Sequence, residues 1–388
     1  MADKANVTLK VLKWARESAR MTVEAAAAKV PVSPEKLAEW EDGTSLPTIR
    51  QAELLAKAYR RPFALFFLPD IPRDFQPLND FRTKGSQPLG TASIFIIREL
   101  QEKQVWLQDV LKEGDGKRLP FVGKFSLKDN PISVARDILQ TLDIDPAHYS
   151  KDPIQEWIEK AEAKGIFISR TSYIHSRMKL DSDEFQGFAI ADEYAPFVFI
   201  NSEDWDSAQL FTLVHEVSHI WIAQSGISNE VGPDTPARDK LHPIELFCNL
   251  VAANALMPQE IMNQKSSVFN SSGTVYRQAK ALGVSSFALL VRAMQLNIIS
   301  LASYNKLKKE ADQAFEEYVQ REEEKKAKAK EKEGGPSPYL LRLNKNGRLF
   351  TQVVLDAFKG GFIEPTVAST LLNTQVNQFH RFEALMHS

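Results

Sequence analysis

The segment from residue 204 to residue 225 constrains the fold most strongly, because it holds two histidines in a stretch without Pro or Gly. Apolar residues recur along it at helical spacing, which predicts a helix from about residue 204 to residue 223. His215 and His219 would lie on one face of that helix, where both rings can bind one ion. Glu216 lies about 100° further around the helix and can reach a water held by that ion. The pattern therefore predicts a zinc site in which Glu216 acts as the general base.

A third ligand is needed, because a catalytic zinc takes three protein ligands whereas a structural zinc takes four. Cys248 is the only cysteine, which excludes a closed cysteine-rich site and any disulfide within the chain. Glu245 stands among apolar residues on the next predicted helix, from about residue 242 to residue 257. A charged group is costly to bury there unless it is paired or bound to a metal. We therefore predict Glu245 as the third ligand, with His242 and Cys248 on the same helix face as rivals.

The chain divides into regions of different pattern. Helical spacing fills residues 7–59, a long helix is predicted from about residue 93 to residue 112, and short β-rich runs lie at residues 166–168, 187–190 and 197–200. Residues 321–333 contain 11 charged residues of mixed sign and precede a Gly-Pro stretch, which is typical of a linker. The predicted domains are residues 1–68, a connector at 69–150, residues 151–320, a linker at 321–338, and a C-terminal module at 339–388.

Composition limits the classes of protein to which this chain can belong. No run of about 18 apolar residues occurs, so we expect no membrane span and no membrane partner. The first 12 residues lack the apolar core and cleavage site of a signal peptide. The lone cysteine favours a reducing compartment, so we expect a cytoplasmic protein. The formal net charge of −2 gives no strongly basic field, so any DNA binding must rest on a local surface.

Around the histidine pair the sequence resembles the ImmA/IrrE family of metallopeptidases. That family has a short His-Glu-x-x-His zincin core with a glutamate on the following helix as third ligand. The glutamate helix of the family is matched here by Glu245, Asn249, two alanines and Leu-Met-Pro at 256–258, and the likeness extends upstream to residues 80–82 and 197–201. The resemblance implies a mostly α fold with a small α+β zincin core, and Zn²⁺ as the cofactor.

The N-terminal region is similar to the XRE-like helix-turn-helix domains that accompany this family, and the resemblance implies five helices. It is carried by Trp40-Glu41-x-Gly43, by Pro47 and by the helix at residues 54–58. The helix that starts near Ser33 would lie in the major groove, which makes Ser33 and Lys36 the candidate DNA contacts. That start offers no Arg, Gln or Asn to a base edge, and residues 1–61 carry 11 basic against 8 acidic residues. Docking of a protein is therefore the alternative role.

In the expected mechanism, Glu216 takes a proton from the attacking water and passes it to the leaving nitrogen. Asn249, one turn beyond Glu245, could hydrogen-bond a ligand histidine and fix its tautomer. Tyr173, His175 and His242 are candidate donors to the oxyanion, and the sequence does not rank them. We expect the substrate to lie extended along an edge strand near residues 187–190 or 197–200.

The sequence thus favours a zinc-dependent endopeptidase. The family resemblance implies that its protein substrate is a transcriptional repressor, cleaved during stress or phage induction, and the fused helix-turn-helix suggests DNA or a cognate toxin as further partners. The alternative is a DNA-binding transcriptional regulator or antitoxin whose zincin domain serves as a sensor or docking module without proteolysis. Bound zinc without DNA retention would favour the peptidase, and DNA binding without metal or cleavage would favour the regulator.

Overall fold

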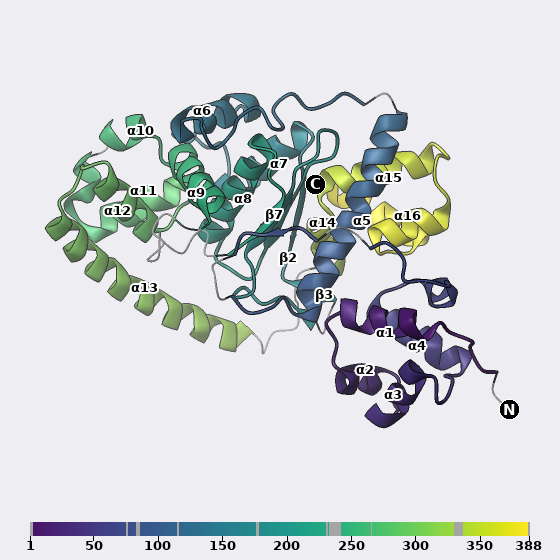
Figure 1. The fold of residues 1–388 in the computed structure, drawn as a ribbon. Coiled ribbons are helices and arrows are strands. Elements are labelled where there is room, and N and C mark those ends of the chain that lie inside the picture. The colour runs from purple at the N-terminus through teal and green to yellow at the C-terminus, as the bar shows by residue number, and fades with distance from the viewer. Residues whose placement is uncertain are drawn as a thin grey trace. The chain divides into compact units, whose positions relative to one another are not determined.

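The chain folds into two compact units. The computed structural model describes residues 3–74, 77–82, 86–114, 116–175, 178–229, 232, 242–264, 266–329 and 337–386 (Figure 1). The first unit comprises Met1–Pro77, Gln87–Glu102 and Tyr173–Leu180. The second comprises Leu78–Ser86, Lys103–Ser172 and Asp181–Ser388. The chain therefore passes between the units several times.

The first unit contains the predicted helix-turn-helix region. Its elements are α1 (Leu9–Ser18), α2 (Val23–Lys29), α3 (Pro34–Asp42), α4 (Ile49–Tyr59), the 3-10 helix η1 (Phe63–Phe67) and the hairpin of β3 (Tyr173–His175) and β4 (Met178–Lys179). Ser33 caps α3 by accepting from the Lys36 N–H at 3.3 Å, and Gly43 ends the helix with a positive φ of 88°. These boundaries confirm the sequence prediction for α3.

A five-stranded mixed sheet lies at the centre of the second unit, in the order β1-β7-β5-β6-β2. The strands are β1 (Asn79–Asp80), β2 (Phe167–Thr171), β5 (Gly187–Ile190), β6 (Phe197–Asn201) and β7 (Gly226–Ser228). β5 pairs antiparallel with β6 and β7, whereas the outer pairs β2–β6 and β1–β7 are parallel. The three predicted β-rich runs are thus confirmed as strands, and β1 and β7 are additions that the sequence did not indicate.

Helices cover both faces of this sheet (Figure 1). On one face, α7 (Pro153–Ala163) packs against β2, α8 (Asp206–Trp221) packs on β5 and β6, and α6 (Pro131–Leu142) and α9 (Pro243–Leu256) pack against α8. Val198 and Ile200 of β6 point into that core. Phe197 and Phe199 alternate with them, and Phe197 contacts Phe350 of α15 (Arg348–Lys359) at 6.2 Å between centroids. Both sheet faces are therefore apolar and buried.

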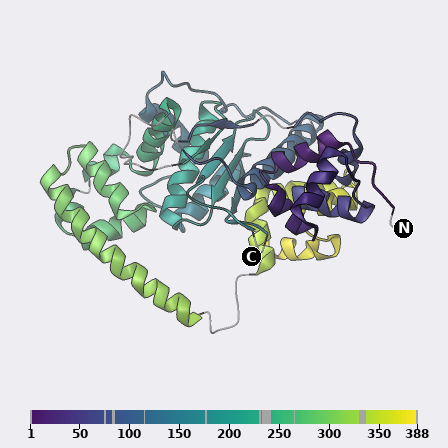
Figure 2. The ribbon, with the colours of Figure 1, turned by 60° about the horizontal axis from the view of Figure 1, so that its bottom comes forward.

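The remaining elements of the second unit are helical. They are the part of α5 (Thr91–Glu113) from Lys103 onward, α10 (Gln259–Gln264), η3 (Ser266–Asn270), α11 (Ser272–Leu282), α12 (Ser286–Gln295), α13 (Leu301–Ala329), α14 (Pro338–Asn346), α16 (Pro365–Leu372), η4 (Val376–Gln378) and α17 (Phe379–Met386). Figure 2 shows α13 as one uninterrupted helix. It enters the mixed-charge run at 321–333, whose side chains lie outside the described residues. Among the described helices, none is long and apolar enough to cross a membrane.

The fold class predicted from the sequence is confirmed: the chain is mostly α-helical around a small sheet, with a helical N-terminal region. One part of the predicted connector, residues 131–142, forms α6 and packs against α8 and α9. Its apolar side chains Val134, Ala135, Ile138 and Leu142 are fully buried there or nearly so. The predicted domain boundaries as a whole stay a prediction.

Candidate metal centre

Helix α8 brings three of the predicted residues together. It runs for 16 residues without a break, as expected from a segment that lacks Pro and Gly. His215 and His219 are one turn apart, and their Nε2 atoms lie 3.1 Å from each other. The side chains of both histidines and of Glu216 are 0% exposed. Polar groups buried this completely require partners from another element.

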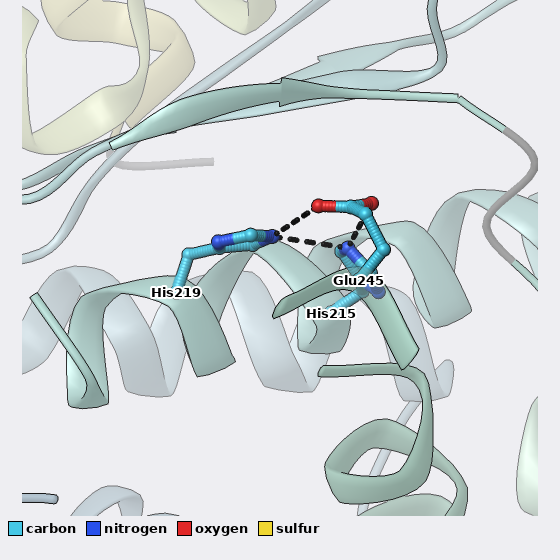
Figure 3. A group of neighbouring side chains, drawn as sticks. All are labelled: His215, His219 and Glu245. Carbon is cyan, nitrogen blue, oxygen red and sulfur yellow. Dashed lines mark hydrogen bonds and ion pairs between the residues drawn. The ribbon is translucent and has the colours of Figure 1, made fainter. Parts of the chain in front are cut away.

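Helix α9 supplies that partner through Glu245, which is also fully buried. The Glu245 Oε1 atom lies 3.1 Å from Nε2 of His219, and Oε2 lies 3.2 Å from Nε2 of His215 (Figure 3). α8 and α9 pack directly against each other, which brings together residues 26 positions apart in sequence. The structure therefore places His215, His219 and Glu245 as one group that could hold a metal ion.

The proton positions in this group favour a cation at its centre. Nδ1 of His215 lies 2.8 Å from Oδ1 of Asn249. An amide oxygen only accepts hydrogen bonds, so Nδ1 donates to Asn249. Nε2 is the ring nitrogen that faces the Glu245 carboxylate, and a metal ion between them would accept a lone pair from each. The residues therefore fit a bound metal ion.

The distances between the donor atoms also fit a bound metal ion. Two ligands that each lie 2.0–2.1 Å from a tetrahedral ion are roughly 3.3 Å apart. The three distances between donor atoms here are 3.1, 3.1 and 3.2 Å. Two imidazole nitrogens and one carboxylate oxygen form a donor set that suits zinc and leaves a fourth position open. The geometry thus requires little rearrangement to accept an ion.

Burial and charge shift the pKa values of the acidic groups in opposite directions. Burial would raise the pKa of Glu245, but the two histidines outweigh it and hold that pKa at about 2. Burial raises the pKa of Glu216 well above its usual range, the Glu245 charge adds to this, and the Ser228 hydroxyl opposes it. Burial lowers the pKa of His219, which favours the neutral ring that a metal requires. Glu245 is thus poised to be the anionic donor of the group, and Glu216 is a strong base.

The Glu216 carboxylate fits against β5 only because residue 187 is a glycine. A Cβ atom at Gly187 would lie 2.9 Å from Oε1 of Glu216 and 2.9 Å from the Phe199 carbonyl oxygen. Ser228 of β7 borders the group from the next strand, with its hydroxyl donating to Oε1 of Glu245 at 3.4 Å. Neither Gly187 nor Ser228 was predicted from the sequence as a site residue. The sequence signal for Gly187 was its position as a glycine at the start of a β-rich run. No sequence signal pointed to Ser228.

The rival ligands lie outside the group. His242 is the N-cap of α9, where its Nδ1 accepts from the Ile244 N–H at 3.3 Å, and its ring stacks on Phe81 rather than joining the donors. Cys248 is buried, and burial raises the pKa of its thiol well above the usual range. A protonated thiol in an apolar setting is a packing residue rather than a metal ligand.

Two of the three oxyanion candidates do not belong to the unit that holds the metal group. Tyr173 lies on β3 in the first unit and is 47% exposed. The His175 backbone also lies in that unit, and its side chain is outside the described residues. His242 belongs to the second unit. No assignment of an oxyanion donor follows for Tyr173 or His175.

The two runs near which the substrate is expected lie inside the sheet. Residues 187–190 and 197–200 form β5 and β6, which are inner strands paired on both sides. Neither is itself an edge strand, because the short strand β7 pairs outside β5 and β2 pairs outside β6. On the metal side, the outer strands are β7 and the two-residue β1 that pairs with it.

The proposed DNA contacts of the first unit lie at the start of α3. The Ser33 hydroxyl is engaged in capping that helix. The Lys36 ammonium donates to Glu39 at 2.6 Å in a half-exposed ion pair. Exposed pairs of this kind are weak and can exchange for a phosphate. The local charge that Lys36 offers is therefore partly neutralised in this conformation.

Two family models match the chain. Residues 161–294 match the IrrE N-terminal-like domain (Peptidase_M78), and residues 10–65 match a helix-turn-helix domain. The comparison with curated proteins found no match. The first matched segment contains the sheet strands β2, β5, β6 and β7, helices α8 and α9, and all of His215, Glu216, His219 and Glu245. The chain therefore carries an IrrE N-terminal-like domain of the Peptidase_M78 family, with a buried His-His-Glu group, behind an N-terminal helix-turn-helix domain.

Proposed function

We propose that this protein is a zinc-dependent endopeptidase in which His215, His219 and Glu245 hold the zinc ion. The observation that carries the proposal is the convergence of these three donors within 4.8 Å of one another, inside a segment that matches a peptidase family. When bound, zinc would supply Lewis acidity that activates water and polarises a peptide carbonyl. Three protein ligands would leave one coordination position of the ion for water or substrate.

Glu216 is the general base in this proposal. Its carboxylate takes a proton from the attacking water and delivers it to the leaving nitrogen as the peptide bond breaks. The raised pKa of Glu216 makes it an effective proton acceptor. Asn249 keeps the proton of His215 on Nδ1 and so keeps Nε2 free to bind the ion. Gly187 leaves the space that the Glu216 carboxylate occupies.

The test is Glu216→Gln in the full chain, with Glu260→Gln as a matched control, because Glu260 is an exposed residue of α10. Glu216→Gln should keep stoichiometric zinc and lose peptide cleavage by about 10²- to 10⁴-fold, the range that general-base catalysis contributes. Glu260→Gln should keep both. Undiminished cleavage by zinc-loaded Glu216→Gln would remove the general-base assignment.

The substrate that best suits this arrangement is a transcriptional repressor, cleaved in response to stress or phage induction. The support is the joining of a peptidase-family domain to a helix-turn-helix domain in one chain. Co-expression with the products of neighbouring genes, followed by mass spectrometry, tests this. Fragments of a repressor that appear with the wild-type chain and vanish with Glu216→Gln would identify the substrate. Fragments of a different class of protein would refute the repressor as substrate.

A second candidate function is DNA binding by the first unit, which the helix-turn-helix match favours. In that role the chain regulates a promoter, alone or together with a cognate toxin. Affinity for promoter DNA should then fall steeply with salt, because phosphate contacts release counterions. Lys36→Ala should weaken binding to all sequences about equally. Retention of DNA by a chain that binds no metal and cleaves nothing would favour a regulator over the peptidase.

A further inference from the structure

A short segment of the second unit lies directly over the metal group. Asn79 and Asp80 form β1 and pair with Gly226 and Ile227 of β7, and the Phe81 N–H continues the ladder by donating to the Ile227 carbonyl at 3.1 Å. The Phe81 ring stacks on His219 with centroids 5.7 Å apart and planes inclined by 6°. Its other ring neighbour is His242, at 5.0 Å. Phe81 therefore covers one of the proposed metal ligands.

This segment occupies the sheet edge that an extended peptide would need. β7 borders the metal group through Ser228, and its inner side is already paired with β5. Extended peptides bind to sheet edges through main-chain hydrogen bonds. The Ile227 carbonyl is one such group, and it is taken by Phe81. The Glu216, His215 and His219 side chains are 0% exposed in this arrangement, so the site as it stands is closed to a substrate.

The segment is short, and its main apolar contact is the Phe81 ring, which is 6% exposed and packs in the hydrophobic core of the second unit. β1 is two residues long, both residues are exposed, and it pairs with β7 alone. The Asn79 side chain donates to the Ser225 carbonyl at 3.0 Å, and Arg82 donates to the Glu184 carbonyl at 3.2 Å. By contrast, every residue of β5 and β6 is buried. A short strand at the end of a sheet can open locally at a lower free energy than global unfolding requires.

The chain enters this segment from the first unit and returns to the first unit after it. Leu78–Ser86 belongs to the second unit, whereas the preceding residues to Pro77 and the following Gln87–Glu102 belong to the first. Both ends of the segment are thus continuous with the unit that carries the helix-turn-helix domain.

We propose that residues 78–82 form a releasable strap, which closes the metal group with Phe81 and must leave the β7 edge before a peptide substrate can enter. This regulatory role rests on the proposed peptidase function. Only molecules with the strap released can bind a substrate. The apparent substrate affinity is therefore the affinity of the open state multiplied by the fraction of molecules that are open. Release of the strap uncovers His219 and the backbone of β7 together.

Gly226 offers a way to release the strap without changing it. A Cβ atom at Gly226 would overlap Cδ2 and Cε2 of Phe81 and lie 3.1 Å from the Asn79 carbonyl oxygen. Gly226→Ala should therefore expel Phe81. Gly273→Ala is the matched control, because a Cβ atom there meets nothing within 4 Å. Phe81→Ala is a second variant that should release the strap, because it removes the ring itself rather than crowding it from β7.

The experiment measures modification of His215 and His219 by diethylpyrocarbonate in the full chain after metal removal, by mass spectrometry of the peptide that contains both. Gly226→Ala and Phe81→Ala should each raise the rate about tenfold or more, which corresponds to loss of roughly 1.4 kcal/mol of docking. Gly273→Ala should match the wild-type chain. Equal rates in all four proteins would overturn the strap, and this readout requires neither metal nor catalysis.

Amide hydrogen exchange in the same proteins supplies the second measurement and checks that they are folded. The Phe81 amide should exchange at least about a hundredfold faster than those of β5 and β6, because the strap opens locally. Protection of Phe81 equal to that of the inner strands would show a permanent strand and overturn the proposal. Faster modification in Gly226→Ala, together with zinc binding but no cleavage of any peptide, would uphold the strap and refute the peptidase function.

Discussion

The two edges of the sheet are closed in different ways. At the β2 edge, the junction of α14 and α15 lies against the strand: Ser169 donates to the Lys345 carbonyl at 2.6 Å, and the Leu349 N–H donates to Glu162 at 3.1 Å. Glu162, Ser169 and Lys345 are all buried. At the β1 edge, two exposed residues and one aromatic ring cover β7. One edge is sealed by a buried polar network, and the other by a short strap.

The difference follows from what each edge must do. An unpaired strand edge invites association with other chains, so an edge without a function is covered permanently. The β2 edge is remote in the sheet order from β7, which borders the metal group. The β1 edge must open if a peptide is to reach His215 and His219. Substitutions at the two edges should therefore have unequal effects on global stability.

The largest effect is expected at Gly347, where α14 and α15 meet. Its φ of 84° and ψ of 148° lie in a region that only glycine adopts readily, and a Cβ atom there would overlap the Ile168 carbonyl oxygen. Gly347→Ala should lower the free energy of unfolding by about 3 kcal/mol or more. Urea denaturation of this variant beside Gly273→Ala measures it. A loss below about 1 kcal/mol would show that the β2 edge is not rigidly sealed.

Glu162 should make the β2 edge sensitive to pH. Burial raises the pKa of this carboxyl from 4.5 to about 7, and its hydrogen bond from Leu349 opposes the shift only in part. The folded state thus binds the proton more tightly than the unfolded chain, so stability is fully present below pH 4.5 and is lost as pH rises through 7. The loss is about 3 kcal/mol at most.

Glu162→Gln removes this titration while keeping an acceptor for the Leu349 N–H. Its stability should therefore fall less than that of the wild-type chain between pH 5 and pH 8, by about 2–3 kcal/mol in urea denaturation. Glu159→Gln, on the same helix and half-exposed, is the matched control and should follow the wild-type chain. Parallel pH profiles for wild type and Glu162→Gln would contradict the burial of this group at the sealed edge.

The smallest effect on global stability is expected at the strap. Removing the Phe81 ring can cost no more than the free energy that docks the strap, so Phe81→Ala should lower the free energy of unfolding by only about 1–2 kcal/mol. Phe199→Ala on the inner strand β6 should cost about 3–5 kcal/mol, as for a fully buried aromatic residue. Equal losses for the two variants would place β1 in the permanent core.

The central part of the site could be predicted from the sequence because its geometry is local. The four-residue spacing of His215 and His219 fixes their relative placement on any helix. Glu245 was recognisable because a charged residue among apolar neighbours needs a buried partner. The strands at 187–190 and 197–201 were recognisable from their β-rich composition. Each of these features is specified by residues within a few positions of one another.

The sheet edges could not be predicted, because they depend on contacts between distant segments. β1 and β7 are two and three residues long, too short for an alternating pattern, and their partners lie 147 positions apart. Phe81 stands in the sequence within the 80–82 run that shares the family likeness, but that likeness gives no sign that its ring stacks on His219. The closeness of Gly226 to Phe81, and of Gly347 to Ile168, becomes visible only in three dimensions.

In the proposed metal centre, His215, His219 and Glu245 bind one zinc ion while Glu216 does not. Competition titration with a chromophoric chelator should give one zinc per chain, with near wild-type affinity in Glu216→Gln. His219→Ala and Glu245→Gln should each lose more than the roughly 10- to 100-fold that removal of a supporting partner costs. Unchanged zinc affinity in both ligand variants would contradict the metal centre and the proposed peptidase with it.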